Sequence, residues 1–357
     1  MAPTDPERGP GAGVEAGRRL RLTRLAAGLS QAELARRCGV SRQAVAGAEA
    51  GSWSPSLAVA LALARALGTT VDRLFAEARS PEPVAATALD RPAPGGRARL
   101  ARVWDRWVGL PLAGDRAASL GFSPASGRLR GEGDLAEPWG RGLALVVAGC
   151  DPALPLLSGS LAALGEGWAA DWWACSSAEA ARLLREGLVH AGAVHRPRGW
   201  RQASAREPEL ATVGFAGWRE GLLLRAEHRR RISSVEDALE AGLRWVNREP
   251  GAEARALLDS ELGRLGAGSG DLPGYRSQAR GHLQVASTVR SGAADVGVAT
   301  EPAALAQGLE FIPLTEEECL LQVERSRLDT PELRLLLQAL AGSQLRRELE
   351  AIPGYDP

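Results

Sequence analysis

Apolar residues follow two different spacings along the 357-residue chain. Over residues 17–77 they recur with helical spacing in short stretches, as in amphipathic helices that each bury one face. From residue 142 onward, short continuous apolar runs alternate with helical stretches, which is typical of strands buried on both faces of a parallel sheet. The expected fold class is therefore multidomain, with an all-α unit followed by an α/β unit.

Two short helices around a glycine turn are predicted at residues 28–51. Ser30 and Glu33 have the spacing of a capping box, so the first helix begins near Gln31. Gly39 can adopt the positive φ that ends this helix, and Ser41 caps the next one. Three further helices complete the unit: one with Leu22, Leu25 and Leu29 in helical register, one over Leu57–Leu67 and one over Val71–Phe75.

The second helix of this pair is predicted to turn polar side chains outward. Its apolar positions, Ala44, Val45 and Ala48, leave Arg42 and Gln43 on the opposite face. Arginine matches the O6/N7 edge of guanine, and glutamine matches the N6/N7 edge of adenine. Arg42 and Gln43 are therefore the candidates for reading bases, unless the helical pair serves only for packing.

Residues 18–75 resemble the phage-repressor-like (XRE-type) helix-turn-helix family through the motifs GLSQxELA, GVSR and SPSL, followed by ALG and LF. The resemblance implies a domain that binds double-stranded operator DNA. It also implies that Gln31 contacts a phosphate, and that Arg42 and Gln43 enter the major groove behind Ser41 at the helix start.

Charge is distributed unevenly, although the formal net charge is zero. Residues 17–76 carry nine arginines against three acidic residues, a local charge of +6, so the remainder carries −6. A basic module favours phosphate contact at one end of the chain, while the acidic remainder limits non-specific binding.

The four cysteines, Cys38, Cys150, Cys175 and Cys319, show no CxxC or Cys/His spacing of a metal site. They are interpreted as reduced thiols, and no metal or cofactor is expected. No apolar run reaches the ~20 residues that cross a bilayer, and the N-terminal segment lacks the apolar stretch of a signal peptide. A cytoplasmic protein without membrane contact is therefore expected.

Composition suggests the domain boundaries. Residues 1–16 are predicted to be a disordered tail, 17–77 the helix-turn-helix domain, and the Pro/Ala/Gly-rich residues 78–97 a linker. Residues 98–141 form a small accessory segment with a possible β-hairpin at its start.

Residues 142–357 are predicted to form βαβ units and an open, mostly parallel sheet. The expected strands include Leu143–Ala148, Ala169–Ala174, His190–Val194, Ala211–Phe215, Gly221–Arg225 and Leu243–Val246.

This region resembles the type 2 periplasmic-binding-protein fold. The motifs are GCDPAL, EAARLLREGLVHAGAVH, WVNREPGAEAR, GHLQVASTVRSGAADVGVAT, LEFIPLTEEE and IPGYD, in that order. It is similar to cytoplasmic binding-protein-like domains attached to helix-turn-helix regulators, some of them related to molybdate-binding proteins. The resemblance implies ligand held in a cleft between lobe I, about 142–200 and 299–357, and lobe II, about 208–298.

Ligand contacts are expected where strands end and helices begin, because helix N-termini present free N–H groups there. Three loops meet this description: 149–151, 175–177 and 247–255. The family motifs add Gly192, His195 and His282. The expected ligand-binding set is Asp151, Ser176, His195, Asn247, Arg248, Gly251, Arg255 and His282.

The loop 247–255 departs from the NRxPGSGTR pattern of relatives, since both hydroxyl residues are absent. Glu253 places a carboxylate where a bound anion would use the helix dipole, which argues against molybdate. Arg248 and Arg255 either bind ligand or pair with nearby acids. His195 and His282 are ligand contacts or structural hydrogen-bonding groups. Three tryptophans form an aromatic wall or pack in the core: Trp168, Trp172 and Trp173.

These features combine into one hypothesis, a transcriptional regulator that binds DNA, senses a small-molecule effector and acts as a homodimer. Two alternatives remain open. The C-terminal unit serves only oligomerisation or protein docking, or it is a binding-protein-fold enzyme. No Ser/His/Asp or Cys/His signature supports catalysis, so no catalytic residue is expected.

Overall fold

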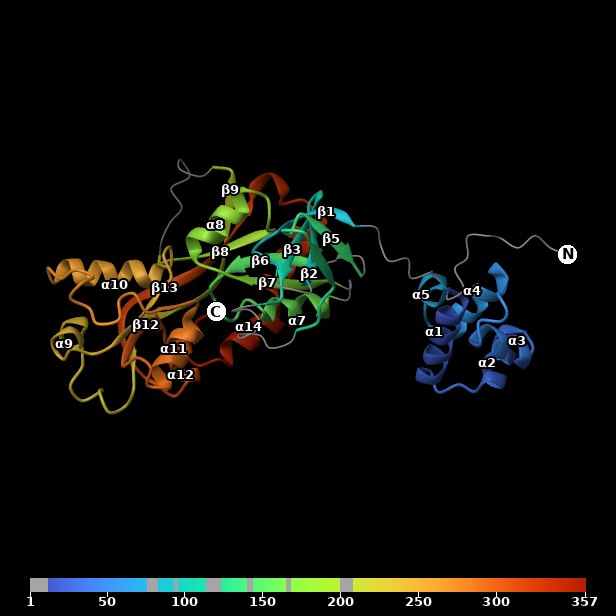
Figure 1. Ribbon diagram of the computed structural model, residues 1–357, viewed down its shortest axis with the longest axis horizontal. Helices are drawn as coiled ribbons and strands as arrows, with labels where there is room; N and C mark the ends of the chain where they lie inside the picture. Colours follow the sequence, from blue (N-terminus) through green and yellow to red (C-terminus); the bar gives the residue numbers. More distant parts are fainter. Residues whose placement is uncertain are drawn as a thin grey trace. The chain divides into compact units, whose positions relative to one another are not determined.

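The computed structural model describes residues 12–75, 83–92, 96–113, 123–139, 144–164, 168–199 and 208–357. The chain forms two compact units, residues 1–81 and 82–357, and each is described by itself (Figure 1). The predicted tail lies outside the described residues up to residue 11, whereas residues 12–16 are helical. No helix in the described part of the chain is both long and apolar enough to span a bilayer.

The described residues of the first unit, 12–75, form five helices, as predicted. They are α1 (Ala12–Ala26), α2 (Gln31–Cys38), α3 (Arg42–Glu49), α4 (Leu57–Ala66) and α5 (Val71–Phe75). Gly39 has a φ of 66° at the end of α2, which confirms the predicted glycine turn. The Ser30 hydroxyl accepts a hydrogen bond from the Glu33 N–H, but the Glu33 carboxylate pairs with Arg36 instead of returning to the cap.

The helical register of Leu22 and Leu25 does not mark the buried face of α1. Leu22 and Leu25 are 56% and 54% exposed, whereas Leu20 is fully buried and Arg24 is nearly so. The reason is a buried ion pair: Arg24 donates to both carboxylate oxygens of Glu49 on α3, at 2.6 and 3.0 Å. Because Leu20 and Arg24 are four residues apart, they share the face that meets α3, and Leu22 and Leu25 face away from it.

The second unit begins with a closed five-stranded barrel in the order β1-β3-β2-β4-β5. Its strands are β1 (Val84–Ala88), β2 (Arg97–Val103), β3 (Arg106–Pro111), β4 (Gly127–Arg130) and β5 (Leu135–Pro138). The predicted linker is therefore wrong from residue 84, because β1 pairs with both β3 and β5 and closes the barrel. The predicted hairpin is formed by β2 and β3, which pair antiparallel.

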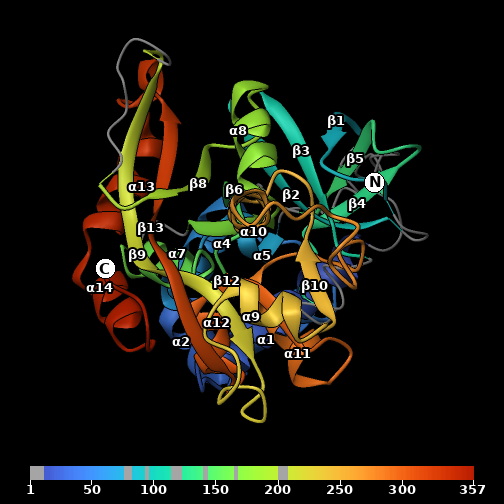
Figure 2. The same cartoon turned by 90° about the vertical axis from the view of Figure 1, so that its left-hand side faces the viewer.

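An eight-stranded sheet follows in the order β11-β10-β12-β9-β13-β8-β6-β7. Its strands are β6 (Ala144–Gly149), β7 (Ala169–Ala174), β8 (Ala191–Pro197), β9 (Leu210–Leu224), β10 (Trp245–Arg248), β11 (Gln278–Ala279), β12 (Val296–Thr300) and β13 (Glu310–Glu324). The expectation of a mostly parallel sheet holds at its two ends, but the centre is antiparallel. There β9 and β13 run side by side (Figure 2).

The long strand β9 replaces the two separate strands predicted at 211–215 and 221–225. It runs without interruption because β13 pairs with it along nearly its whole length. These two strands connect the lobes. Lobe I contains the core around β6–β8, and lobe II contains the core around β10–β12.

Helices cover both lobes. Lobe I carries α7 (Leu156–Ala163), α8 (Ser177–Arg185), α13 (Pro331–Ala341) and α14 (Ser343–Glu350), with a 3₁₀ turn at Arg325–Arg327; lobe II carries α9 (Val235–Glu240), α10 (Glu253–Arg264), α11 (His282–Arg290) and α12 (Glu301–Ala306). The predicted assignment of residues 299–314 to lobe I is wrong. Ala303, Ala304 and Leu309 pack in the lobe II core, so the chain re-enters lobe I only within β13.

Candidate functional site

The helix-turn-helix surface presents the polar residues at the start of α3. Ser41 accepts a hydrogen bond from the Ala44 N–H at 3.1 Å, which fixes the start of the helix. Arg42 and Gln43 follow it with exposed side chains, and Val45 is buried on the inward face. This arrangement is the one that readout in a major groove requires.

Gln31 has a second role that its sequence position did not reveal. Its side-chain amide donates to Glu49 Oε2 at 2.8 Å, the same carboxylate that pairs with Arg24. The start of α2 is thus tied to the end of α3 through Glu49. Only the remaining N–H and the carbonyl of this amide are left for a phosphate-side contact.

A cavity of about 770 Å³ lies in the second unit, within the size range of small-molecule sites. Lobe I contributes Cys150 and Trp172–Ser176 to its lining, and lobe II contributes Glu249 and Arg280–Gln284. The barrel contributes Leu89–Arg91 from the loop after β1. Sequence reasoning missed the barrel's share, because these residues lay in the predicted linker.

Two of the predicted ligand residues line this cavity. Ser176 caps α8 by accepting from the Glu179 N–H at 3.3 Å, and His282 is the first residue of α11. Trp172 and Trp173 also line it, while Trp168 packs against the lobe I core. All three tryptophans pack in or against a core of lobe I, so the packing interpretation holds, and an aromatic wall for a ligand stays a prediction for Trp172 and Trp173.

Asp151 is placed away from the cavity lining and ties the C-terminal segment to lobe I. Its Oδ1 atom accepts from the Tyr355 hydroxyl at 2.6 Å and from the Ala153 N–H at 2.7 Å. The side chain is 1% exposed. Burial raises its pKa, although the hydrogen bond from Tyr355 opposes that shift.

The loop after β10 is held together by its own side chains. Arg248 is 1% exposed and donates to both oxygens of Glu249, at 2.8 and 2.9 Å. Asn247 accepts from the Arg248 N–H at 2.8 Å. Arg255 donates to the Arg248 carbonyl at 3.0 Å and lies over the Tyr275 ring. Arg248 is thus paired, as one alternative proposed, but it is buried rather than on a solvated surface.

The same loop brings lobe II against lobe I. Gly251 has a φ of 84°, and a Cβ there would lie 2.9 Å from the Ala178 Cβ and 3.1 Å from the Ser176 hydroxyl. Only glycine fits this approach. Glu253, predicted to repel an anion, pairs with Arg196 of lobe I at 2.9 Å. Both contacts cross between the lobes, so this end of the cleft is closed.

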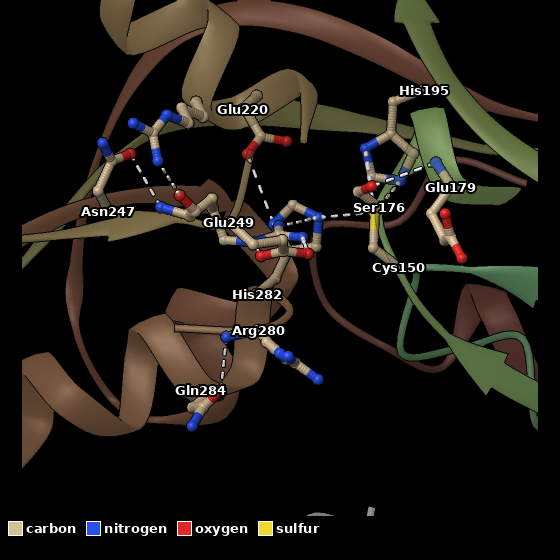
Figure 3. Close-up of polar contacts among 12 residues, drawn as sticks. Cys150, Ser176, Glu179, His195, Glu220, Asn247, Glu249, Arg280, His282 and Gln284 are labelled. Atoms are coloured by element: carbon tan, nitrogen blue, oxygen red, sulfur yellow. Dashed lines mark hydrogen bonds and ion pairs between the residues drawn. The ribbon is translucent and has the colours of Figure 1, made fainter. Parts of the chain in front are cut away.

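The cleft holds a buried cluster that combines a thiol, two imidazoles and two carboxylates. Figure 3 shows four of its members, Cys150, His195, His282 and Glu220. The Cys150 Sγ atom lies 3.3 Å from His195 Nε2 and 3.6 Å from His282 Nε2. The other nitrogens face acids: His195 Nδ1 is 3.7 Å from Glu317 Oε2, and His282 Nδ1 is 3.5 Å from Glu220 Oε1. All five side chains are buried.

Burial shifts the ionisation of this cluster towards neutral forms. It raises the pKa of Cys150 to about 11 and raises the pKa of Glu220 and of Glu317 above their usual range. It lowers the pKa of both histidines, and the positive charge of Arg248 lowers that of His282 further. The predicted residues His195 and His282 thus meet, together with three residues outside the predicted ligand set.

No spacing along the chain could have revealed this cluster, since its members come from β8, β9, β13, the loop after β6 and the start of α11. One partial signal was available: Glu220 lies just before the apolar run 222–224, whereas Glu317 is the middle of three glutamates and is not singled out by its neighbours. A carboxylate in a buried strand needs a buried partner.

Comparisons with known proteins match both units. A model described as the PBP superfamily domain matches residues 159–341, and one described as a helix-turn-helix domain matches residues 15–76.

Curated relatives and solved structures are similar to parts of the chain. The uncharacterized protein YvgK of Bacillus subtilis (strain 168) is 32% identical over 136 residues, which is 38% of this chain and 44% of that protein. A protein of the ferredoxin 2Fe-2S gene 5′ region of Clostridium pasteurianum is 33% identical over 101 residues, 28% of this chain and 89% of that protein. The chain therefore spans less than half the length of the Bacillus relative. The controller protein C.AhdI of Aeromonas hydrophila is 45% identical, covering 17% of this chain and 94% of that one, with a TM-score of 0.17.

Proposed function

The chain belongs to the PBP superfamily, and we propose that it is a transcriptional regulator whose cavity senses a small-molecule effector. One observation carries the proposal: a helix-turn-helix unit with an exposed recognition surface is joined to a unit with a small-molecule-sized cavity. We propose no catalytic role for the residues of the cleft.

In this proposal, operator DNA is read by the start of α3. Arg42 and Gln43 contact base edges, while Ser41 and the free part of the Gln31 amide lie beside phosphates. The regulator acts as a homodimer, because helix-turn-helix proteins commonly read two half-sites one helical turn apart. The protein works in the cytoplasm, where that DNA is found.

Effector and DNA are coupled through the lobes. A ligand alters DNA affinity only if it binds the DNA-competent and the incompetent arrangements unequally. The cavity is suited to this role because it is lined by both lobes and by the barrel, so any relative movement changes its walls. Ser176, His282 and Arg280 are the polar groups that we assign to effector contact.

A second candidate function draws support from the closed end of the cleft. Arg248, Glu249 and Gly251 fill it with the protein's own atoms, as expected of a unit that only oligomerises or docks a protein. The open cavity beside them favours sensing.

The test has two parts. Operator fragments are first selected from random duplex DNA with the full-length protein, and their affinity is measured by fluorescence anisotropy at fixed salt. A thermal-shift screen of anions, amino acids, nucleosides and metal ions then identifies stabilising ligands. A ligand that raises stability, changes operator affinity and loses both effects in His282→Gln supports the sensor. If no sequence is enriched over bulk DNA, the regulator proposal fails.

A further inference from the structure

The deep cluster of the cleft has the donor set and the surroundings of a transition-metal site. We propose that Cys150, His195 and His282 bind a zinc-class cation, with Glu220 and Glu317 as carboxylates behind the two imidazoles. This inference names a ligand for the cleft and in that sense rests on the proposed sensor function.

The distances suit a tetrahedral ion. With Zn–S of ~2.3 Å and Zn–N of ~2.0–2.1 Å, tetrahedral geometry separates sulfur and nitrogen by about 3.5 Å. The observed Sγ to Nε2 separations are 3.3 Å for His195 and 3.6 Å for His282. Both sulfur–nitrogen separations are thus already close to the value that a tetrahedral ion requires, before any ion binds.

The carboxylates complete the pattern. A histidine that binds metal through one nitrogen usually turns its other nitrogen towards a carboxylate, which fixes the tautomer and raises the basicity of the ligand. Both imidazoles do so here, His195 towards Glu317 and His282 towards Glu220. The facing oxygens, Glu317 Oε2 and Glu220 Oε1, have no hydrogen-bond partner within the described part of the chain.

Arg248 contacts two of the proposed ligands. Its Nη1 atom is 3.2 Å from both ring nitrogens of His282, and its guanidinium also lies beside the Cys150 thiol, whose pKa burial raises and this guanidinium lowers. Binding of an ion through His282 Nε2 therefore requires this guanidinium to move aside. The Cys150 Sγ atom lies within 3.9 Å of both nitrogens of His195, so binding requires that ring to rotate about its Cβ–Cγ bond.

On binding, the metal displaces the proton of the Cys150 thiol, which passes to solvent, and each histidine contributes a neutral nitrogen. Cys150 and His282 line the cavity, so a fourth coordination position faces it. Water or a donor atom of an effector completes the tetrahedron there.

The experiment uses the reduced, chelator-treated full-length protein. Zn²⁺ is titrated against a competing chelator, and Co²⁺ serves as a spectroscopic probe of thiolate coordination. We expect one ion per chain and a thiolate-to-cobalt charge-transfer band. Cys150→Ser should abolish the band, whereas Cys38→Ser, which changes a thiol of the first unit, should retain it.

Variants of the acids that face the proposed metal ligands test the site independently. Glu220→Gln should weaken Zn²⁺ affinity about 10- to 100-fold, as loss of an outer carboxylate does at metal sites. Glu179→Gln, which changes another acid of the same cavity, should leave Zn²⁺ affinity unchanged. Circular dichroism of each variant checks that it is folded. No stoichiometric Zn²⁺ binding by the unmodified protein, or a cobalt band that survives Cys150→Ser in a folded protein, overturns the metal site.

Operator affinity measured with and without Zn²⁺ separates the two proposals. A tight site without any change in operator affinity upholds the metal inference and rejects sensing through this ion. An organic effector that changes operator affinity in a protein without Zn²⁺ binding upholds the sensor and rejects the metal site.

Discussion

The recognition surface on α3 and the cluster around Cys150 are built in opposite ways. Ser41, Arg42 and Gln43 are consecutive and exposed, and one local hydrogen bond fixes the helix that carries them. The cluster gathers side chains from positions as distant as Cys150 and Glu317, and all of them are buried.

This difference explains how changes at each region should act. An exposed residue on a locally stable helix can be replaced without disturbing the fold, so its loss affects only what it contacts. A buried polar residue holds distant segments together. Its removal leaves its hydrogen-bonding or ionic partner buried with neither a protein group nor water to interact with, which costs stability. Four predictions test this contrast.

The largest effect is expected at Glu49, a buried, long-range contact inside the otherwise local first unit. Glu49→Ala leaves the Arg24 guanidinium buried and unpaired, which costs about 3–5 kcal/mol of stability. Hydrogen exchange of the α1 and α3 amides in the full-length protein measures the loss. Glu33→Ala removes the partly exposed partner of the exposed Arg36 and should change exchange little. Equal exchange in the two variants would show that local signals alone stabilise this unit.

His190 provides a buried contact of the second unit that responds to pH. Burial, together with the positive charge of Arg327, lowers its pKa to about 4. Because the folded pKa is depressed, its contribution to stability is present above the unfolded pKa of ~6.5 and is lost as pH falls towards about 4. The shift corresponds to about 3 kcal/mol.

Urea unfolding at a series of pH values measures this contribution. Neutral His190 accepts from the Val146 N–H at 2.9 Å, and His190→Asn should flatten the acid dependence between these pH values. His228→Asn, at a partly exposed position, should retain it. An unchanged slope in His190→Asn would remove His190 as the origin of acid sensitivity.

Arg42→Ala should weaken binding to the selected operator by about 1–3 kcal/mol, roughly 5- to 150-fold, and leave stability unchanged, because the side chain is exposed. Anisotropy titrations with operator and unrelated duplexes measure the specific part. Arg65→Ala, at an exposed arginine of α4, serves as the matched control. An equal loss on both duplexes would reassign Arg42 to phosphate contact.

The smallest effect is expected at Ser41, where the contact is purely local. Ser41→Ala removes the hydroxyl that accepts from the Ala44 N–H and should cost ~1 kcal/mol. Exchange of the first α3 amides measures it. Ser41→Thr keeps the capping hydroxyl and should restore most of the exchange protection of these amides. If Ser41→Thr exchanges as fast as Ser41→Ala, the capping hydroxyl is not the cause of the loss.

Local chemistry accounts for the elements that the sequence predicted well. Helices α2, α3 and α4 of the first unit begin at serine caps, and α2 also ends at a glycine turn, so their signals lie within a few residues of one another. Strand β7 was predicted with the bounds that it has, since its apolar run is bounded by turn residues. In each case the determining atoms are neighbours along the chain.

The errors share one origin in contacts between distant segments. Strand β1 has a composition suited to a linker, and it becomes a strand only because β3 and β5 pair with it. The inward face of α1 is set by Leu20 and by the ion pair of Arg24, not by Leu22 and Leu25. Strand β9 is continuous because β13 supplies hydrogen bonds through the predicted gap.

The candidate site divides in the same way. Sequence motifs brought His195 and His282 into the expected ligand set, but their partners Cys150, Glu220 and Glu317 were outside it. The spacing of these five residues along the chain has no metal or catalytic signature, because each comes from a different element.

The sequence by itself determined the two-unit organisation, the exposed polar start of α3 and the alternation of strands and helices in the second unit, because periodicity and capping are encoded by residues close along the chain. The binding-protein fold followed from the resemblance of its motifs. Tertiary structure alone decided which side chains meet in the cleft, that Arg248 lies against His282, and that the barrel forms part of the cavity wall. Those contacts depend on strand pairing between segments that are far apart in sequence, and no local pattern records which segments will pair.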